Sequence, residues 1–230
     1  MNLLIALPCS HDSVPTGFAV SLGEMEKPLN CEVRHFGGYS VEMMRNNIAA
    51  YFLNERKGEP NFTDLLMLDI DMVYPRNTAI ALFRRNKDLV AGLSSAKWVD
   101  DVGPEGEKRQ VWKFWFYDEQ TRDDDPYAVR CSGNIPTSGC HQVKALPGAG
   151  ILIKRRVMEA LPKPPFRFDF VSSSECRVGE DIFATVTART LGFELWQDCD
   201  LKFGHIANLA AFPEVSETGK WKVVQRLIRT

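Results

Sequence analysis

The stretch Thr63–Pro75 reads TDLLMLDIDMVYP and is the part of the chain that decides the fold. Within it, the apolar run Leu65–Leu68 leads directly into Asp69, Ile70 and Asp71. A short apolar run bounded by polar residues is typical of a strand buried on both faces, as in a parallel sheet. Side chains alternate along a strand, so Asp69 and Asp71 are predicted to point the same way and Ile70 into the protein.

Two neighbouring carboxylates at the end of a buried strand indicate a cation site. They repel each other and stay ionised most easily with a cation between them. Open α/β sheets bind ligands at the carboxyl ends of their strands, which is where Asp69 and Asp71 are expected. The sequence therefore predicts a divalent metal site, although a bare D-x-D is common and these carboxylates can instead cap the following turn.

Composition bounds the class of protein. The 230 residues, 44% hydrophobic and 25% charged, suit a single globular domain with a sizeable core. A net charge of −2 provides no overall basic field for nucleic acid. The start, MNLLIALPCSHD, has no basic region and too short an apolar run for a signal peptide or a transmembrane segment. We therefore expect a cytoplasmic protein whose six cysteines are reduced.

A zinc site is a further alternative, because Cys131, Cys140 and His141 fall in one loop-like stretch. No fourth ligand is evident beside them in the sequence.

The first part of the chain alternates between predicted strands and helices. The strands are Leu3–Leu7, Glu32–Phe36, Leu65–Leu68 and Asp88–Leu93, and the helices are Thr16–Met25, Ser40–Lys57 and Pro75–Arg85. This order argues for right-handed βαβ units and a mainly parallel sheet. Arg45, on the second helix, can pair with a phosphate or a carboxylate, although an exposed helical arginine is more often only solvated.

The second part of the chain is less regular. The aromatic run QVWKFWFY at Gln110–Tyr117 predicts a strand of a hairpin or an added subsheet, and its tryptophans can face a ligand or pack. Further predicted elements are a strand at Ile151–Ile153, helices at Lys154–Leu161 and Ile182–Leu191, and a final strand at Phe193–Gln197. Glu180 and Asp181 either complement the positive end of the second of these helices or serve as catalytic carboxylates.

Together, these segments resemble a metal-dependent nucleotide-diphospho-sugar glycosyltransferase of the GT-A fold, close to family 2 and to small bacterial and phage-encoded members. The matching stretches are Ser40 with Arg45-Asn46, LLMLDIDMVYP at 65–75, ALPGAGILIKRRVMEAL at 145–161, GEDIFATVTARTLGFELW at 179–196 and Lys202–His205. The resemblance implies a Rossmann-like α/β fold, with a mainly parallel central sheet flanked by helices and a small added β subsheet. It also implies one domain, with a nucleotide-binding half at 1–95 and an acceptor half at 96–230.

The resemblance further implies roles for individual residues. The metal ligands are expected to be Asp69, Asp71 and His205, and mixed carboxylate and imidazole ligation suits Mn²⁺ better than Mg²⁺. The nucleotide-sugar is expected to contact Pro8, Cys9, Ser10, Arg45, Asp69, Ile70, Asp71, Gly148, Ala149 and Gly150. Asp181 resembles the general base of inverting members, with Glu180 beside it in the same motif.

The expected activity is transfer of a sugar from a nucleotide diphosphate, with a UDP-sugar favoured, to an acceptor hydroxyl. The acceptor stays open among a saccharide, a protein, a lipid head group and a modified nucleic-acid base. One departure from family 2 affects base recognition. In that family the proline is typically followed by Asn-Glu, whereas here the loop reads Pro8-Cys9-Ser10-His11-Asp12.

Other functions stay open beside this one. A retaining transfer mechanism and a sugar-nucleotide hydrolase, with water as the acceptor, would use similar site residues. A nucleotidyltransferase shares the architecture, but residues 8–17 lack the glycine-rich loop with a lysine that such enzymes carry. A catalytically inactive glycan-binding module is the remaining alternative.

Overall fold

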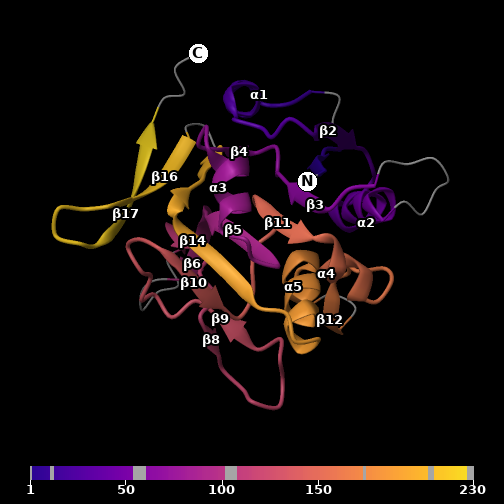
Figure 1. Ribbon diagram of the computed structural model, residues 1–230. Helices are drawn as coiled ribbons and strands as arrows, with labels where there is room; N and C mark the ends of the chain where they lie inside the picture. The colour runs from indigo at the N-terminus through magenta and orange to yellow at the C-terminus, as the bar shows by residue number, and fades with distance from the viewer. Residues whose placement is uncertain are drawn as a thin grey trace.

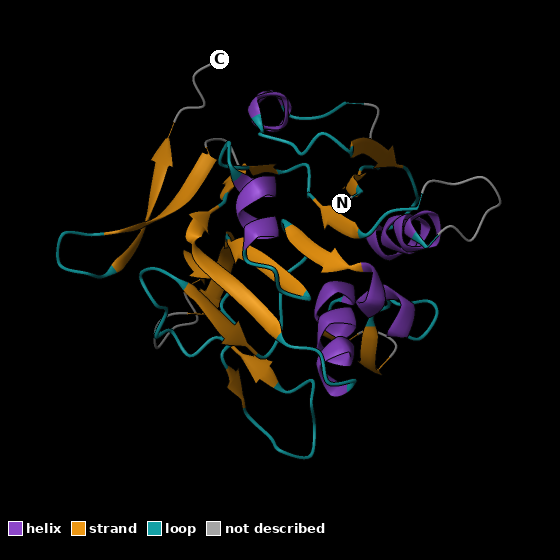
Figure 2. Ribbon diagram, viewed as in Figure 1, coloured by secondary structure: helices purple, strands orange, loops and turns teal. Residues whose placement is uncertain are grey.

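The computed structural model describes residues 2–10, 13–53, 61–101, 108–172, 175–206 and 210–226, and every structural statement below refers to these residues. They form a central sheet with helices on both faces (Figure 1 and Figure 2). The helices are α1 (Thr16–Glu24), α2 (Val41–Phe52), α3 (Thr78–Arg84), α4 (Arg155–Ala160) and α5 (Glu180–Thr190).

The central sheet has seven strands in the order β10-β14-β5-β11-β3-β1-β2. Their bounds are β1 (Leu3–Pro8), β2 (Cys31–Phe36), β3 (Asp64–Met67), β5 (Leu89–Leu93), β10 (Cys140–Val143), β11 (Ile151–Lys154) and β14 (Leu195–Lys202). Strands β1, β2, β3, β5 and β14 run in one direction, whereas β10 and β11 run against their neighbours. The predicted α/β class with a mainly parallel, helix-flanked sheet is therefore confirmed.

Two apolar cores lie on the two faces of this sheet. Alternate residues of β1 and β3, such as Leu4 and Leu65, pack with α2, α4 and α5. The intervening residues, such as Ile5 and Leu66, pack with Phe18 of α1 and with α3. Figure 1 shows α2, α4 and α5 gathered at one side of the sheet, with α3 on the other. Because both faces are covered, the inner strands β1, β3, β5 and β11 are predominantly apolar, as the run at 65–68 predicts.

Smaller sheets extend the fold. A four-stranded one joins β4 (Met72–Val73), β15 (Gly204–Ile206), β16 (Ala210–Val215) and β17 (Trp221–Arg226). Two-stranded ones pair β6 (Ser95–Asp101) with β7 (Lys108–Phe114), β8 (Glu119–Gln120) with β9 (Val129–Arg130), and β12 (Asp169–Ser172) with β13 (Glu175–Val178). The antiparallel pairing of β6 with β7 confirms the hairpin predicted at the aromatic run.

Several predicted boundaries are wrong. The strand predicted at Phe193–Gln197 is not the last one, because β14 continues to Lys202 and three more strands follow. Of these, β15 pairs with distant β4, whereas β16 pairs with its sequence neighbours β15 and β17. Helix α2 ends at Phe52 rather than Lys57, and residues 54–57 lie outside the described part. Helix α3 begins at Thr78, after a turn that follows Pro75.

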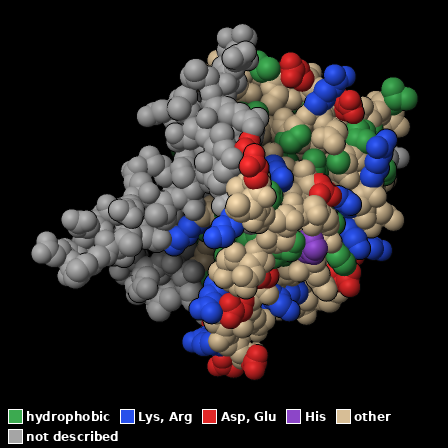
Figure 3. Space-filling model, turned by 90° about the vertical axis from the view of Figure 1, so that its left-hand side faces the viewer, with side chains coloured by type: hydrophobic (Ala, Val, Ile, Leu, Met, Phe, Trp, Pro, Cys, Tyr) green, Lys and Arg blue, Asp and Glu red, His purple; other side chains and the backbone are tan. Residues whose placement is uncertain are grey.

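The surface charge and the apolar character of the helices both bear on what the protein can bind. Acidic and basic side chains are intermixed over the described part of the face in Figure 3, which agrees with the net charge of −2. None of the described helices combines the length and the apolar character that crossing a membrane requires.

Candidate active site

The strand order brings separate segments to one edge of the sheet. Strands β1, β3 and β5 end at this edge, and β11, which runs the opposite way, begins there, with Ile151 opposite Met67 and Ala91. The segment Gly148–Gly150, which precedes β11, therefore lies beside the residues that follow β3. This is the edge at which open α/β sheets bind ligands.

The two aspartates follow β3 rather than belonging to it. β3 ends at Met67, and Ile70 and Asp71 form a turn. The predicted continuation of the strand is therefore wrong here, whereas half-buried Ile70 packs against the core as predicted and also lines the same cavity as Asp69 and Asp71. The Tyr74 hydroxyl donates a hydrogen bond to the Asp69 carbonyl oxygen (3.0 Å), which fixes the turn against the core.

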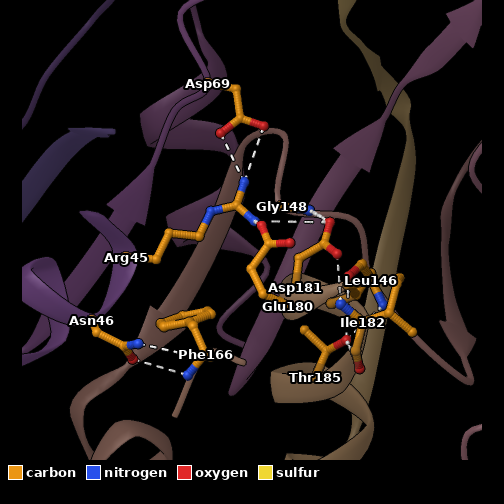
Figure 4. Close-up of polar contacts among 10 residues, drawn as sticks. All are labelled: Arg45, Asn46, Asp69, Leu146, Gly148, Phe166, Glu180, Asp181, Ile182 and Thr185. Carbon is orange, nitrogen blue, oxygen red and sulfur yellow. Dashed lines mark hydrogen bonds and ion pairs between the residues drawn. The ribbon is translucent and has the colours of Figure 1, made fainter. Parts of the chain in front are cut away.

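Arg45 is buried and ion-paired, so the solvated alternative for this residue is wrong. Its side chain is 3% exposed, and its Nη2 lies 2.9 Å and 3.2 Å from the carboxylate oxygens of Asp69. Its Nη1 bonds to Glu180 and lies 4.0 Å from Asp181 (Figure 4). One guanidinium therefore joins the turn after β3 to the start of α5.

Gly148 makes room for this arrangement. A Cβ atom at position 148 would lie 2.2 Å from Arg45 Nη2, so a side chain there would displace the guanidinium. The Gly148 N–H also donates to Asp181 Oδ2 at 2.7 Å, while the Ile182 N–H donates to Asp181 Oδ1 at 2.7 Å. The Asp181 carboxylate is thereby fixed at the first turn of α5.

Negative charge exceeds positive charge in this cluster. Burial raises the pKa of Asp69 above its usual range, with the Asp71 and Asp181 charges adding to the effect against Arg45. Burial likewise raises the pKa of Glu180, with Asp181 and Asp69 contributing. Although burial opposes the charge of Arg45, these carboxylates raise its pKa. A further cation near the cluster would relieve the repulsion.

His205 lies beside Asp71 because of strand pairing. Strand β15 pairs with β4, which places His205 opposite Met72, and the Ile206 N–H donates to the Asp71 carbonyl oxygen (2.7 Å). His205 Nε2 lies 3.4 Å from Asp71 Oδ2. The structure thus brings together two of the three predicted metal ligands, while Asp69 faces Arg45.

No cluster of three or more His, Cys, Asp or Glu side chains arranged to bind a metal occurs in the described part of the chain. This applies to the zinc alternative at Cys131, Cys140 and His141 as well as to the aspartates. Asp71 and His205 form a two-residue donor set, which fits an ion that takes its remaining ligands from a phosphate substrate and water.

Two cavities meet at the aspartates. The larger cavity has a volume of about 640 Å³, and its lining residues are Pro8, Ser10, Ser13, Val14, Pro15, Val41, Met44, Asp69, Ile70 and Asp71. The smaller cavity, of about 140 Å³, is lined by Asp69, Asp71, Met72, Ser94, Ser95, Trp115, Pro147, Gly148, Ala149, Asp181 and His205. Asp69 and Asp71 line both and therefore lie at their junction.

The remaining predicted residues lie away from these linings. Cys9 is buried, with its N–H bonded to the Phe36 carbonyl oxygen. Gly150 faces the core, where a Cβ atom would lie 2.4 Å from the Phe203 ring. Arg45 and Glu180 form a buried ion pair with each other. The predicted loop residues His11 and Asp12 lie outside the described part.

Sequence reasoning missed several lining residues. Ser94 and Ser95 directly follow β5, so the rule that ligands bind at the carboxyl ends of strands could have identified them. Trp115 is one of the tryptophans for which the sequence left contact with a ligand and packing as alternatives.

The comparisons with known proteins concern the fold. By sequence, the chain matches no protein-family model and no curated protein. By structure, it is similar to A197 from STIV, with a TM-score of 0.56, 17% identity and coverage of 100% of this chain and 98% of that one. It is also similar to GalNAc-T7, crystallised with UDP, GalNAc and Mn²⁺, with a TM-score of 0.52, 13% identity and coverage of 90% of this chain.

The chain spans only 44% of the GalNAc-T7 chain. An inositol-1-phosphate CTP transferase from T. maritima also matches, at 15% identity and coverage of 86% and 89%, but its TM-score of 0.36 is too low to support a shared fold. At such identities a structural likeness establishes the fold and nothing finer. The protein has the GT-A type of α/β fold that the sequence predicts.

Proposed function

We propose that the chain is a metal-dependent glycosyltransferase that transfers a sugar from a nucleotide-diphosphate donor, with a UDP-sugar favoured, to an acceptor hydroxyl. The observation that carries the proposal is the position of Asp69 and Asp71 at the junction of two cavities. The larger, of about 640 Å³, falls within the ~300–1,000 Å³ typical of small-molecule sites and suits a nucleotide. The smaller contains Asp181, so a diphosphate at the junction would place its sugar beside that carboxylate.

Asp71 and His205 would hold the metal ion, with Asp69 next to them. A carboxylate with an imidazole suits Mn²⁺, and the remaining positions suit phosphate oxygens and water. When bound, the ion supplies positive charge against the diphosphate leaving group. The excess of carboxylates over Arg45 favours a cation here, and the presence of UDP and Mn²⁺ in the GalNAc-T7 crystal agrees with this choice.

Asp181 is proposed as the general base of an inverting reaction. Its oxygens each accept one backbone N–H, which orients the carboxylate and leaves each oxygen a further lone pair. In the reaction the acceptor oxygen bonds to the anomeric carbon, the bond from that carbon to the diphosphate breaks, and the acceptor proton passes to Asp181.

The contacts of Arg45 and Glu180 support positioning roles instead of contact with the donor. Arg45 bonds to both Asp69 and Glu180 from a buried position and lies 4.0 Å from Asp181. It thereby links the proposed diphosphate side of the site to the proposed base. Glu180 supplies one of the charges that keep the guanidinium in place.

A ligand screen tests the proposal. We expect UDP-sugars with Mn²⁺ to raise the melting temperature, because a ligand that binds only the folded state stabilises it. GDP- and CDP-sugars, nucleoside triphosphates and metal-free samples complete the screen, and mass spectrometry of the products identifies transfer. A response confined to nucleoside triphosphates would favour a nucleotidyltransferase, and no nucleotide response would favour a glycan-binding module.

Variants of the metal ligands sharpen the screen. Asp71→Asn and His205→Gln are expected to abolish the Mn²⁺-dependent part of the thermal shift. They should also reduce the rate of transfer at least tenfold, and a tenfold reduction corresponds to about 1.4 kcal/mol of lost transition-state stabilisation. Asp123→Asn is the matched control, because Asp123 is exposed and lies outside both cavity linings. If folded Asp71→Asn transferred sugar as fast as the parent in Mn²⁺ buffer, the proposal would be wrong.

A further inference from the structure

Two serines that line the smaller cavity have buried hydroxyl groups that no described residue satisfies. Ser94 and Ser95 are each 1% exposed and line the cavity, and neither Oγ has a hydrogen-bond partner among the described residues. A buried hydroxyl without a partner destabilises the folded state, because it has lost its hydrogen bonds to water. Such a cost is retained most readily where a ligand supplies the missing partner.

An aromatic wall lies next to these hydroxyls. Trp115 lines the same cavity, and its backbone N–H donates to the Ser94 carbonyl oxygen at 3.1 Å. Its ring stacks on Tyr117, with centroids 5.9 Å apart and planes 3° from parallel. Asp181 lines the same cavity as Trp115, so this aromatic pair lies near the proposed base.

The chemistry of this lining suits one sugar ring. A flat aromatic surface packs against the C–H face of a pyranose, while hydroxyl groups bond to its hydroxyls. At about 140 Å³, the cavity is smaller than the ~300–1,000 Å³ of sites for drug-sized ligands. Asp71 and His205 line the cavity together with Asp181. A ring within it would therefore contact both the diphosphate side and the base.

We propose that Ser94, Ser95 and Trp115 bind the sugar that is transferred and determine which sugar the protein accepts. The inference rests on the proposed function, because it takes the ring in the smaller cavity to be part of a nucleotide-sugar. It adds a recognition role for three residues of the β5 end and the aromatic run. In this role the serine hydroxyls form hydrogen bonds with the hydroxyls of the sugar, and the indole packs on one face of the sugar ring and excludes water from it.

The test separates sugar binding from nucleotide binding. Calorimetric titration in Mn²⁺ buffer gives the Kd of UDP and of UDP-glucose, UDP-galactose, UDP-N-acetylglucosamine and UDP-N-acetylgalactosamine. In the parent, we expect at least one of these sugars to bind more tightly than UDP. In Ser94→Ala, Ser95→Ala and Trp115→Leu we expect that sugar to bind about three- to tenfold more weakly, with the Kd of UDP unchanged.

Two further measurements exclude a merely structural role. Loss of a hydroxyl without a partner should leave the melting temperature of the ligand-free protein unchanged or raise it, whereas loss of a structural hydrogen bond would lower it. Ser138→Ala is the matched control, because Ser138 is exposed and lines neither cavity, and all its Kd values should equal those of the parent.

The possible failures are distinguishable. If the parent binds UDP and a UDP-sugar, but the three variants keep the parent's preference, the recognition role is wrong and the proposed function stands. If the parent binds neither UDP nor any of the four UDP-sugars, the UDP-sugar function fails and this inference fails with it.

Discussion

At the scale of single residues, the charge balance of the site depends on Arg45 and on the space that Gly148 leaves for it. The guanidinium fills the volume that a side chain at position 148 would occupy. It also holds Asp69 and Glu180 by ion pairs in a buried setting, where the loss of one partner leaves an uncompensated charge.

Gly148→Ala is therefore expected to be destabilising. The new Cβ would lie 2.2 Å from Arg45 Nη2, and overpacking of this kind costs about 1–3 kcal/mol of unfolding free energy. Gly23→Ala in α1 is the control, because no atom lies within 4 Å of its Cβ position, and helical Gly→Ala stabilises by about 0.5–1 kcal/mol. Urea unfolding measures both, and equal stabilisation by the two substitutions would contradict the close packing of Arg45 on Gly148.

The raised pKa of Glu180 predicts a pH dependence of stability. A carboxyl whose folded pKa exceeds its unfolded value of about 4.3 contributes stability below that value and loses it as pH rises through the folded pKa. The unfolding free energy of the parent, relative to Glu180→Gln, should therefore fall as pH rises from about 4 through this window. Urea titrations at several pH values measure the difference.

Glu217→Gln is the control for this prediction, because Glu217 is exposed in the turn between β16 and β17. A difference for Glu180→Gln that grew as pH rose would show that the carboxylate is stabilised by Arg45 more than it is penalised by burial.

At the scale of elements, the position of β15 depends on the Phe203 side chain that precedes it. Phe203 is fully buried, and its ring lies edge-on to Tyr74 with centroids 4.9 Å apart. Cβ atoms at Gly92 and Gly150 would lie 2.2 Å and 2.4 Å from the same ring. Strand β5 and the segment before β11 therefore leave space for one ring, and that ring anchors the segment that carries His205.

Gly92→Ala should weaken this anchor. The added methyl group collides with the Phe203 ring, so we expect a loss of about 1–3 kcal/mol of unfolding free energy. We also expect a smaller Mn²⁺-dependent thermal shift, because His205 moves with its strand. Phe203→Leu, which shortens the side chain, should offset part of the loss in the double variant. A double-mutant cycle on urea unfolding measures the coupling, and strict additivity would show that Gly92 and Phe203 do not interact.

At the scale of the whole molecule, the two expected halves share one sheet. β11, from the half at 96–230, lies between β3 and β5 of the half at 1–95. The two apolar cores also draw residues from both halves. Neither half contains the complete central sheet among its described residues, so we expect the two to unfold together.

The distribution of tryptophan makes this expectation measurable. All five tryptophans, at positions 98, 112, 115, 196 and 221, lie in the second half, whereas far-UV circular dichroism reports on both. The two signals should give one coincident urea transition. An earlier or later transition by fluorescence alone would show that the halves unfold separately.

The sequence by itself determined the α/β alternation, the position of the buried strand at 65–68 and the acidic pair after it. These features depend on local patterns, because an apolar run and its bounding residues are read directly from neighbouring positions. The hairpin at the aromatic run was predictable for the same reason. Arg45 and Asp181 were identified as candidates, but their contact was not.

Only the tertiary structure decided what these residues do to one another. Helix α2 supplies Arg45, α5 supplies Glu180, and the reversed strand β11 places Gly148 against the Arg45 guanidinium. Pairing of β4 with β15, separated by about 130 residues, places His205 beside Asp71. Contacts between segments so far apart in the chain follow from strand order and direction, and no local sequence pattern encodes them.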